Sequence, residues 1–253
     1  MVENTDTPRF GRSHALVRIL KREDVPVVKA LVRTLKTHFE RESCLLAICP
    51  NSRAVTRAAL LAAQEANAPL LLTSTLNQVD RDGGYTGWTH DALVDFLQQE
   101  AERLEVDVPI LPCLDHGGPW LKDRHTMQGY SFEETMGAVK RSLESCIDAG
   151  YELLHIDPTV DRRTPAGAPV SIDWVVENTL DLIEHAEQYR RDEGRPPISY
   201  EVGTEEVHGG LADLDTFDRF LEQLDAGLHE RGLDDAWPCF VGGEVGTDLD
   251  TSY

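Results

Sequence analysis

Residues 108–118, VPILPCLDHGG, join an apolar run to a short polar sequence. A nearly continuous apolar run of this length is typical of a strand that is buried on both faces of a parallel sheet. The pair Asp115-His116 comes where that strand ends. The stretch therefore predicts an α/β fold whose polar chemistry lies at the carboxyl end of a buried strand.

Five other runs of the same kind predict five more strands. They are 44–49 (CLLAIC), 68–75 (APLLLTST), 152–157 (ELLHID), 197–203 (PISYEVG) and 238–243 (PCFVGG). Amphipathic patterns between them predict helices near 52–66, 89–104, 131–149, 171–191 and 213–231, and a further one near 26–41. The third helix begins with Ser131 and has Glu134 three residues later, which is the spacing of a capping box.

This alternation gives about six β/α units and leaves two architectures to compare. A (β/α)8 barrel of the TIM type carries its chemistry at the carboxyl ends of the strands, whereas a doubly wound sheet binds its ligand where the strand order reverses. No G-x-G-x-x-G follows the first strand, and no G-x-x-x-x-G-K-[ST] occurs in the chain. We therefore favour the barrel.

Six strands do not close an eight-stranded barrel. We expect the chain to be a piece of a longer protein that lacks the last units of the barrel. Residues 1–253 are then one TIM-barrel-like domain, with a helical extension over residues 1–42.

The charge of the chain limits its partners. The 24 basic and 45 acidic residues give a net charge of −21. So acidic a surface repels nucleic-acid phosphates and anionic lipid, and a small anionic substrate would need a local positive patch or a metal. No stretch has the length and apolarity of a membrane helix, and the first ten residues have no apolar signal core. We expect a soluble, cytoplasmic protein.

Two kinds of chemistry are disfavoured by composition. Lysine occurs five times, and only Lys122 falls in a predicted loop after a strand, which makes imine catalysis improbable. The five cysteines, at 44, 49, 113, 146 and 239, form no C-x-x-C pair, so we expect reduced thiols and no cysteine zinc cluster.

The pair Asp115-His116 is the most specific candidate for a functional site. A neutral imidazole is a good ligand for a divalent ion such as zinc, and a carboxylate beside it can transfer protons. A metal there would polarise a ketose carbonyl. The alternative is that both side chains only order their loop through hydrogen bonds.

Other candidates follow the neighbouring strands. Glu201 ends an apolar strand, where an unpaired carboxylate is costly to bury, so it would bind a metal or a substrate hydroxyl, or else pair with Arg162 or Arg163. His155 and Asp157 alternate on one strand and share a face, where they would line the site or form a satisfied core pair.

Three loop features carry weaker signals. His208, before two glycines, could complete a metal site, although a solvated loop histidine is the plainer interpretation. Gly83-Gly84 and Gly117-Gly118 would let backbone amides approach a phosphate, but double glycines are common in turns.

Five motifs in series resemble a known family. They are Asn77-Gln78-Val79, Gly83-Gly84-Tyr85-Thr86-Gly87, Asp115-His116-x-Gly118-Pro119, His155-Ile156-Asp157 and Gly203-Thr204-Glu205 with Gly209-Gly210. In order and spacing, from about residue 45 to 247, they are similar to the GatZ/KbaZ family, the non-catalytic subunits of class II D-tagatose-1,6-bisphosphate aldolase.

The resemblance implies roles for several residues. The family is related to the metal-dependent class II aldolases, which are (β/α)8 barrels. On that basis Asp115 is the acid/base, His116 a ligand of zinc or manganese, and Glu201 a second catalytic carboxylate. The substrate-binding residues implied by these motifs are Asn77, Gln78, Gly83, Gly84, His155, Asp157 and Glu205.

Departures from the aldolase pattern concern the metal. The catalytic aldolases take two more histidines from the ends of strands six and seven, whereas this chain has Glu244 after strand six and no predicted seventh strand. His208 becomes a substitute ligand.

Two functions are compatible with the resemblance. In the first, the protein is an accessory subunit that stabilises a catalytic class II aldolase subunit, acts in tagatose or amino-sugar catabolism and is oligomeric. In the second, it is itself a metal-dependent epimerase that acts at C4 of a phosphorylated ketose such as tagatose 6-phosphate, or of tagaturonate.

Overall fold

The computed structural model describes residue 20 and residues 23–38, 44–165, 168, 170–203 and 214–243. Six strands in these parts form one parallel sheet, and their order in the sheet is their order in the sequence. They are β1 (Leu46–Ile48), β2 (Leu70–Thr75), β3 (Ile110–Gly117), β4 (Leu153–Ile156), β5 (Ser199–Gly203) and β6 (Phe240–Gly242). All six lie within or close to the predicted apolar runs.

Helices connect the strands, as the sequence pattern predicts. They are α2 (Val27–His38), α3 (Arg53–Ala66), α4 (His90–Arg103), α6 (Phe132–Ala149), α7 (Ile172–Asp192) and α8 (Leu214–Glu230). Two shorter elements were not predicted, α5 (Asp123–Met127) and the 3-10 helix η3 (Asp234–Ala236), because so few residues show no periodicity. Sequential parallel pairing without a reversal is the arrangement of a barrel, so the described strands form an incomplete TIM-type barrel.

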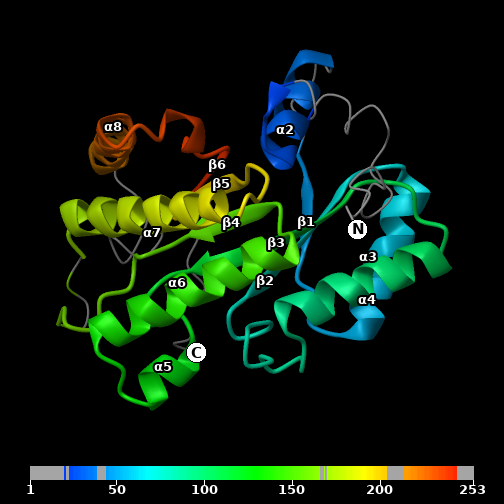
Figure 1. Cartoon of the computed structure of the whole chain (residues 1–253), viewed down its shortest axis with the longest axis horizontal. Coiled ribbons are helices and arrows are strands. Elements are labelled where there is room, and N and C mark those ends of the chain that lie inside the picture. The colour runs from blue at the N-terminus through cyan, green and yellow to red at the C-terminus, as the bar shows by residue number, and fades with distance from the viewer. Residues whose placement is uncertain are drawn as a thin grey trace, which may run out of the picture.

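Side chains that alternate along the strands pack into two apolar cores. Leu70, Leu72 and Leu154 pack in the larger core with the connecting helices, whereas Leu71 and Leu153 pack in a smaller core with α2. In Figure 1, α2 stands apart from the row formed by α4, α6 and α7. Strand alternation therefore places α2 against the opposite face of the sheet.

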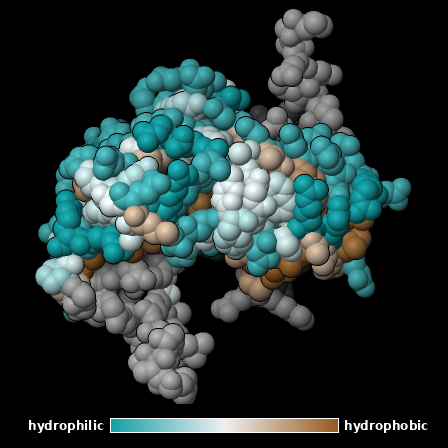
Figure 2. All heavy atoms as spheres, turned by 90° about the horizontal axis from the view of Figure 1, so that it is seen from below, coloured by the Kyte–Doolittle hydropathy of each residue, from teal (hydrophilic) through white to brown (hydrophobic). Residues whose placement is uncertain are grey.

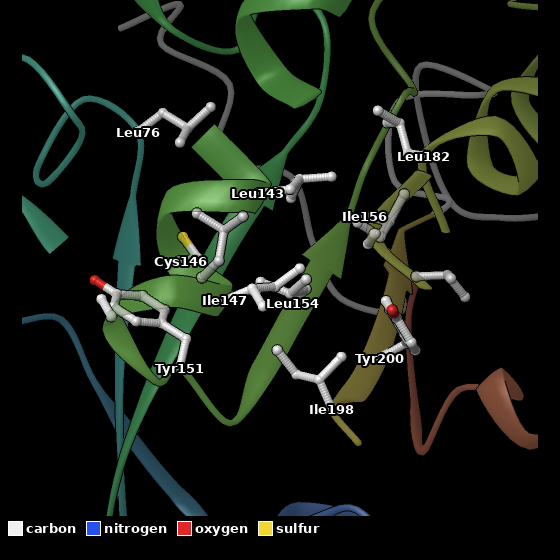
Figure 3. Close-up of a cluster of buried hydrophobic side chains, with 14 of the residues drawn as sticks. Leu76, Leu143, Cys146, Ile147, Tyr151, Leu154, Ile156, Leu182, Ile198 and Tyr200 are labelled. Atoms are coloured by element: carbon white, nitrogen blue, oxygen red, sulfur yellow. The ribbon is translucent and has the colours of Figure 1, made fainter. Parts of the chain in front are cut away.

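Helix α6 shows how the larger core is packed. Leu143, Cys146 and Ile147 point from α6 toward Leu154 and Ile156 of β4 (Figure 3). The predicted capping box is confirmed, since the hydroxyl of Ser131 accepts from the backbone N–H of Glu134 and the Glu134 carboxylate accepts from that of Ser131. The cap fixes where α6 begins, and its apolar face then lies on the sheet.

The surface reflects the acidic composition. In the face shown in Figure 2, hydrophilic residues cover most of the described atoms, and apolar residues appear in scattered spots. Within the described residues, no helix is both long enough and apolar enough to cross a membrane.

The ends of β3 and β4 approach each other closely. The parallel register shifts between Leu114 and Gly117, and His116 between them has φ 49°, in the left-handed region. A Cβ atom on Gly118 would lie 1.7 Å from the carbonyl oxygen of Asp157. Only glycine therefore allows this approach, which brings the polar residues that follow the two strands together.

Replacement of Gly118 by alanine should be strongly destabilising. The new methyl group meets backbone atoms, which cannot move aside as a side chain can, so we expect Gly118→Ala to lower the free energy of unfolding by about 3 kcal/mol. Gly137→Ala is the matched control in helix α6. Its Cβ would meet only the flexible end of Arg141, at 3.4 Å, so this change should be neutral or stabilise by about 0.5–1 kcal/mol. Urea unfolding of both variants measures the contrast, and equal effects would contradict this packing.

Candidate metal and acid–base site

Four polar side chains meet at the carboxyl ends of β3 and β4. Asp115 and His116 lie near the end of β3, His155 lies in β4, and Asp157 follows β4 directly. The carboxyl end of the sheet is where barrel enzymes place their chemistry. The structure thus brings together four of the residues that the sequence selects.

The contacts within this group are short. The Nδ1 atom of His155 lies 3.3 Å from Oδ1 of Asp115, and Nε2 of His116 lies 3.7 Å from the same oxygen. The two imidazole rings have their centroids 4.8 Å apart and are tilted by 42° to each other. Asp115 is therefore in contact with both histidines.

Asp157 orients the imidazole ring of His116 through its Nδ1 atom. Its Oδ2 atom lies 2.5 Å from Nδ1 of His116, and its Oδ1 atom accepts hydrogen bonds from the backbone N–H and the hydroxyl of Thr159. The Asp157 side chain is 2% exposed, whereas that of His116 is 41% exposed. With Nδ1 donating to Asp157, the lone pair of the ring lies on Nε2, at the accessible side. This carboxylate–histidine pairing is the arrangement that commonly supports metal-binding imidazoles.

The group holds opposite charges. Burial raises the pKa of Asp115, but the hydrogen bond with His155 and the charges of both imidazoles outweigh it, so the pKa of Asp115 lies below its ordinary value. Burial likewise raises the pKa of Asp157, and His116, His155 and Thr159 bring it below the ordinary value. Burial lowers the pKa of His155, but contact with Asp115 and the charges of Glu201 and Asp157 raise it overall.

The donor set fits a divalent cation. One ligand atom each from Asp115, His116 and His155 lie within 4.8 Å of one another. The buried Nε2 atom of His155 has no hydrogen-bond partner among the described residues. Nδ1 of His155 lies 3.3 Å both from the backbone N–H of His116, which can donate to it, and from Oδ1 of Asp115. In the tautomer that carries its proton on Nδ1, the lone pair on Nε2 is available to a cation. Nitrogen and carboxylate ligands suit zinc, and manganese accepts the same set.

Glu201 lies on the adjacent strand. It pairs in register with His155, and its charge contributes to the raised pKa of that histidine. The sequence left open an ion pair of Glu201 with Arg162 or Arg163. Both arginines have other partners, since Arg163 pairs with Asp161 and Arg162 donates to the hydroxyl of Thr126. Glu201 therefore lies beside the cation set, and its catalytic role stays a prediction.

The polar side chains of the loop after β2 bond to the end of β2 and to the segment after β3. The Asn77 side chain donates to the carbonyl of Leu121 and accepts from the backbone N–H of Asp123, while the Gln78 side chain accepts from the backbone N–H of Thr75. A Cβ atom on Gly84 would lie 2.2 Å from the carbonyl oxygen of Gln78.

Gly83 in the same loop has φ 93° and donates its N–H to the carbonyl of Asp80. These contacts hold the segment from Asn77 to Gly84 in one conformation. Contact of Asn77, Gln78, Gly83 and Gly84 with a substrate stays a prediction.

A buried ion cluster that the sequence did not reveal supports this loop. The ammonium of Lys122 lies 2.5 Å from Asp80 and 2.6 Å from Asp82, and Asp80 also accepts from the hydroxyl of Ser142. His90 lies 4.0 Å from Asp80. The cluster ties the loop after β2 to the loop after β3. Its one sequence signal is that Lys122 is the only lysine in a loop after a strand.

Three residues named from the sequence, Glu205, His208 and Glu244, lie outside the described residues. Their predicted parts in substrate and metal binding stay predictions. The candidate site is therefore defined by Asp115, His116, His155 and Asp157.

Comparison with known proteins shows the family and supports the fold. A family model described as D-tagatose-1,6-bisphosphate aldolase subunit GatZ/KbaZ-like matches residues 29–241. A solved structure of a probable tagatose 6 phosphate kinase from Sinorhizobium meliloti 1021 is 26% identical, with a TM-score of 0.62 over 77% of this chain and 47% of that chain.

A second solved structure is more distant. The fructose-bisphosphate aldolase of Campylobacter jejuni is 10% identical, with a TM-score of 0.53 over 78% of this chain and 54% of that chain. At that identity the likeness concerns the fold alone. The chain spans about half the length of both proteins.

Removal of the Asp157 carboxylate should weaken metal binding without removing a proposed ligand. We expect Asp157→Asn to lower the affinity for Zn²⁺ by about 10–100-fold, because the imidazole of His116 loses its orienting partner. Calorimetric titration of the metal-free chain with Zn²⁺ measures this. Asp181→Asn, which breaks an exposed ion pair with Lys140, is the control and should bind like the parent. Equal affinity in both variants would contradict the arrangement.

The buried imidazole of His90 gives a pH-dependent test of the supporting cluster. Burial lowers the pKa of His90 to about 4, although the charge of Asp80 opposes this. Since the unfolded chain protonates this histidine at about 6.5, the contribution of His90 to stability decreases as the pH falls from about 6.5 to about 4.

Nuclear magnetic resonance titration of the imidazoles should show this directly. The His90 signal should stay constant down to pH 5, whereas exposed His229, whose pKa Asp234 raises, should titrate above 6.5. Titration of His90 near the ordinary value would show that water reaches the cluster.

Proposed function

Because the chain belongs to the D-tagatose-1,6-bisphosphate aldolase subunit GatZ/KbaZ-like family, we propose that it is a subunit of a class II tagatose-bisphosphate aldolase in carbohydrate metabolism. Its partner in this proposal is a catalytic aldolase subunit, with which it assembles as an oligomer in the cytoplasm. The chain itself holds a divalent cation, zinc or manganese, and a phosphorylated ketose at the carboxyl ends of β3 and β4.

One observation carries the second half of this proposal. One ligand atom each from Asp115, His116 and His155 lie within 4.8 Å of one another, and Asp157 holds the ring of His116. Apolar residues would pack at the ends of these strands at a lower cost in desolvation free energy than carboxylates and imidazoles do. Their presence together supports a site that binds.

The residues would divide the chemistry as follows. His116 and His155 would hold a divalent cation, which when bound would supply a Lewis acid for a ketose carbonyl. Asp157 keeps His116 in one orientation. Asp115, whose pKa lies below its ordinary value, is a carboxylate at neutral pH and accepts the proton of a substrate hydroxyl.

The same group favours a second function, that of an epimerase acting at C4 of tagatose 6-phosphate or of tagaturonate. An accessory subunit needs no acid–base residue, yet Asp115 lies 3.3 Å from the protonatable Nδ1 of His155, and Glu201 lies on the next strand. These groups would accept the proton of the C4 hydroxyl as the C3–C4 bond opens to an enediolate and an aldehyde. They would return it to the new C4 oxygen when the bond recloses on the other face of the aldehyde. The two functions differ in whether the chain turns over substrate alone.

One experiment separates them. Full-length protein is incubated with tagatose 6-phosphate, and separately with the 1,6-bisphosphate, in Zn²⁺ or Mn²⁺, with and without a catalytic class II aldolase subunit. Products are followed by nuclear magnetic resonance. We expect no turnover by the chain alone, and faster cleavage of the bisphosphate by the partner when the chain is added.

The stability of the partner gives a second readout. At 100 times its dissociation constant, the chain should stabilise the partner by about 2.7 kcal/mol and raise its Tm by about 5–10 °C. Epimer formed by the chain alone, and reduced about 10²–10⁴-fold by Asp115→Asn but not by Asp181→Asn, would instead establish the epimerase. Neither turnover nor an effect on the partner would overturn both functions.

A further inference from the structure

A recess of about 430 Å³ lies beside the carboxyl ends of β3 and β4. It opens between the α5–α6 connection and the segment that follows β4, and its lining includes Trp120, Thr126, Ser131, Phe132, Arg162 and Arg163. In Figure 1 the connection from β4 to α7 passes the same end of the molecule as α5 and the first turn of α6. Volumes of this size are common for small-molecule sites.

Arg163 packs against three aromatic rings at this recess. Its guanidinium lies 4.5 Å from the ring centre of Phe132, 5.6 Å from that of Trp174 and 6.0 Å from that of Trp120. Its Nε atom also lies 2.8 Å from the carboxylate of Asp161. Aromatic packing and this ion pair set the direction of the side chain, and thereby the wall of the recess.

Arg162 is differently placed. Its Nη1 atom donates to the hydroxyl of Thr126 at 3.1 Å, and no carboxylate lies within ion-pair distance of it among the described residues. Its guanidinium keeps further donors for a ligand, because a hydroxyl takes only one of its five N–H groups. An arginine fork of this kind matches the oxygens of a phosphate.

The charges around the recess balance, in contrast to the acidic molecule as a whole. Arg162 and Arg163 line it, against the carboxylates of Glu133 and of Asp161, which pairs with Arg163, so these four groups sum to zero in a chain of net charge −21. The Glu133 carboxylate accepts from the hydroxyl of Ser131. Arg162 is therefore the cation of the recess that has no carboxylate within ion-pair distance among the described residues, and it is the group that can attract an anion.

The recess is also close to the candidate cation site along the chain. Arg162 is five positions after Asp157, so their Cα atoms are at most about 18 Å apart. Trp120 follows His116 by four residues on the other wall. Both walls of the recess are thus direct continuations of the two strands that carry the site.

We propose that Arg162, with the wall formed by Arg163, Thr126 and Ser131, binds the phosphate group of a phosphorylated sugar. This assignment rests on the proposed function in one respect, that a phosphorylated ketose is the ligand. The phosphate site itself requires neither the cation nor a catalytic partner, and can be tested without them.

The test is calorimetric titration of the full-length, metal-free chain with inorganic phosphate, tagatose 6-phosphate and unphosphorylated tagatose. The variants are Arg162→Ala, Arg162→Lys and Arg141→Ala, the last being an exposed arginine of α6 outside the recess. We expect Arg162→Ala to weaken both phosphate-containing ligands by about tenfold or more, the loss of a charge-assisted hydrogen bond. Arg162→Lys should recover part of the affinity, and Arg141→Ala should bind like the parent.

Two results would overturn the proposal. One is the absence of phosphate binding by the parent chain, and the other is equal phosphate binding by Arg162→Ala and Arg141→Ala. Failure of the aldolase function would leave these titrations unchanged, because they contain no partner and no metal. Folding of each variant is checked by its urea midpoint, and Arg162→Lys covers the case in which Arg162→Ala is destabilised.

Discussion

The contact between the ends of β3 and β4 is the constraint on which the rest of the site depends. Gly117 and Gly118 let the two strands come so close that the carbonyl of Asp157 occupies the space of a side chain. That approach puts His116 against Asp157 and His155 against Asp115. With a larger residue at Gly118 the strands must separate, and the four side chains would no longer meet.

The packing of the strands also explains why the polar groups lie at the strand ends. The strands pack between connecting helices on one face and α2 on the other, so their middle sections are apolar. Polar groups can only gather beyond the strand ends, where the loops begin. There the Asp80–Lys122 ion cluster fixes one loop, and the aromatic packing of Arg163 fixes another. A rigid mouth of this kind can position ligands without large rearrangement.

Much of this could be predicted from the sequence, and the reasons for the rest are physical. Apolar runs predicted the six described strands, and burial explains this composition in β2, β3, β4 and β5, whereas β1 and β6 at the edges of the described sheet are exposed or only partly buried. Asp115-His116 was selected for its chemistry, and the alternation of His155 and Asp157 for its geometry. The left-handed backbone of His116 was not predicted, since it depends on the shifted register with the next strand.

Contacts between distant residues escaped prediction as well. The pairing of Lys122 with Asp80 spans 42 residues, and nothing local in either segment points to the other. The recess at Arg162 and Arg163 was likewise missed, although the two arginines were named as partners for Glu201. Sequence patterns report which elements form, whereas such pairings follow only from how loops fold over the sheet.

The central claim is that His116 and His155 hold one divalent cation beside Asp115 at the ends of β3 and β4. Anomalous diffraction from crystals of the full-length protein grown with Zn²⁺, recorded on both sides of the zinc edge, tests it most directly. The account predicts one strong anomalous peak within bonding distance of His116 and His155, with Asp157 still bonded to the His116 ring. A zinc peak elsewhere in the molecule, with these side chains unliganded, would contradict it.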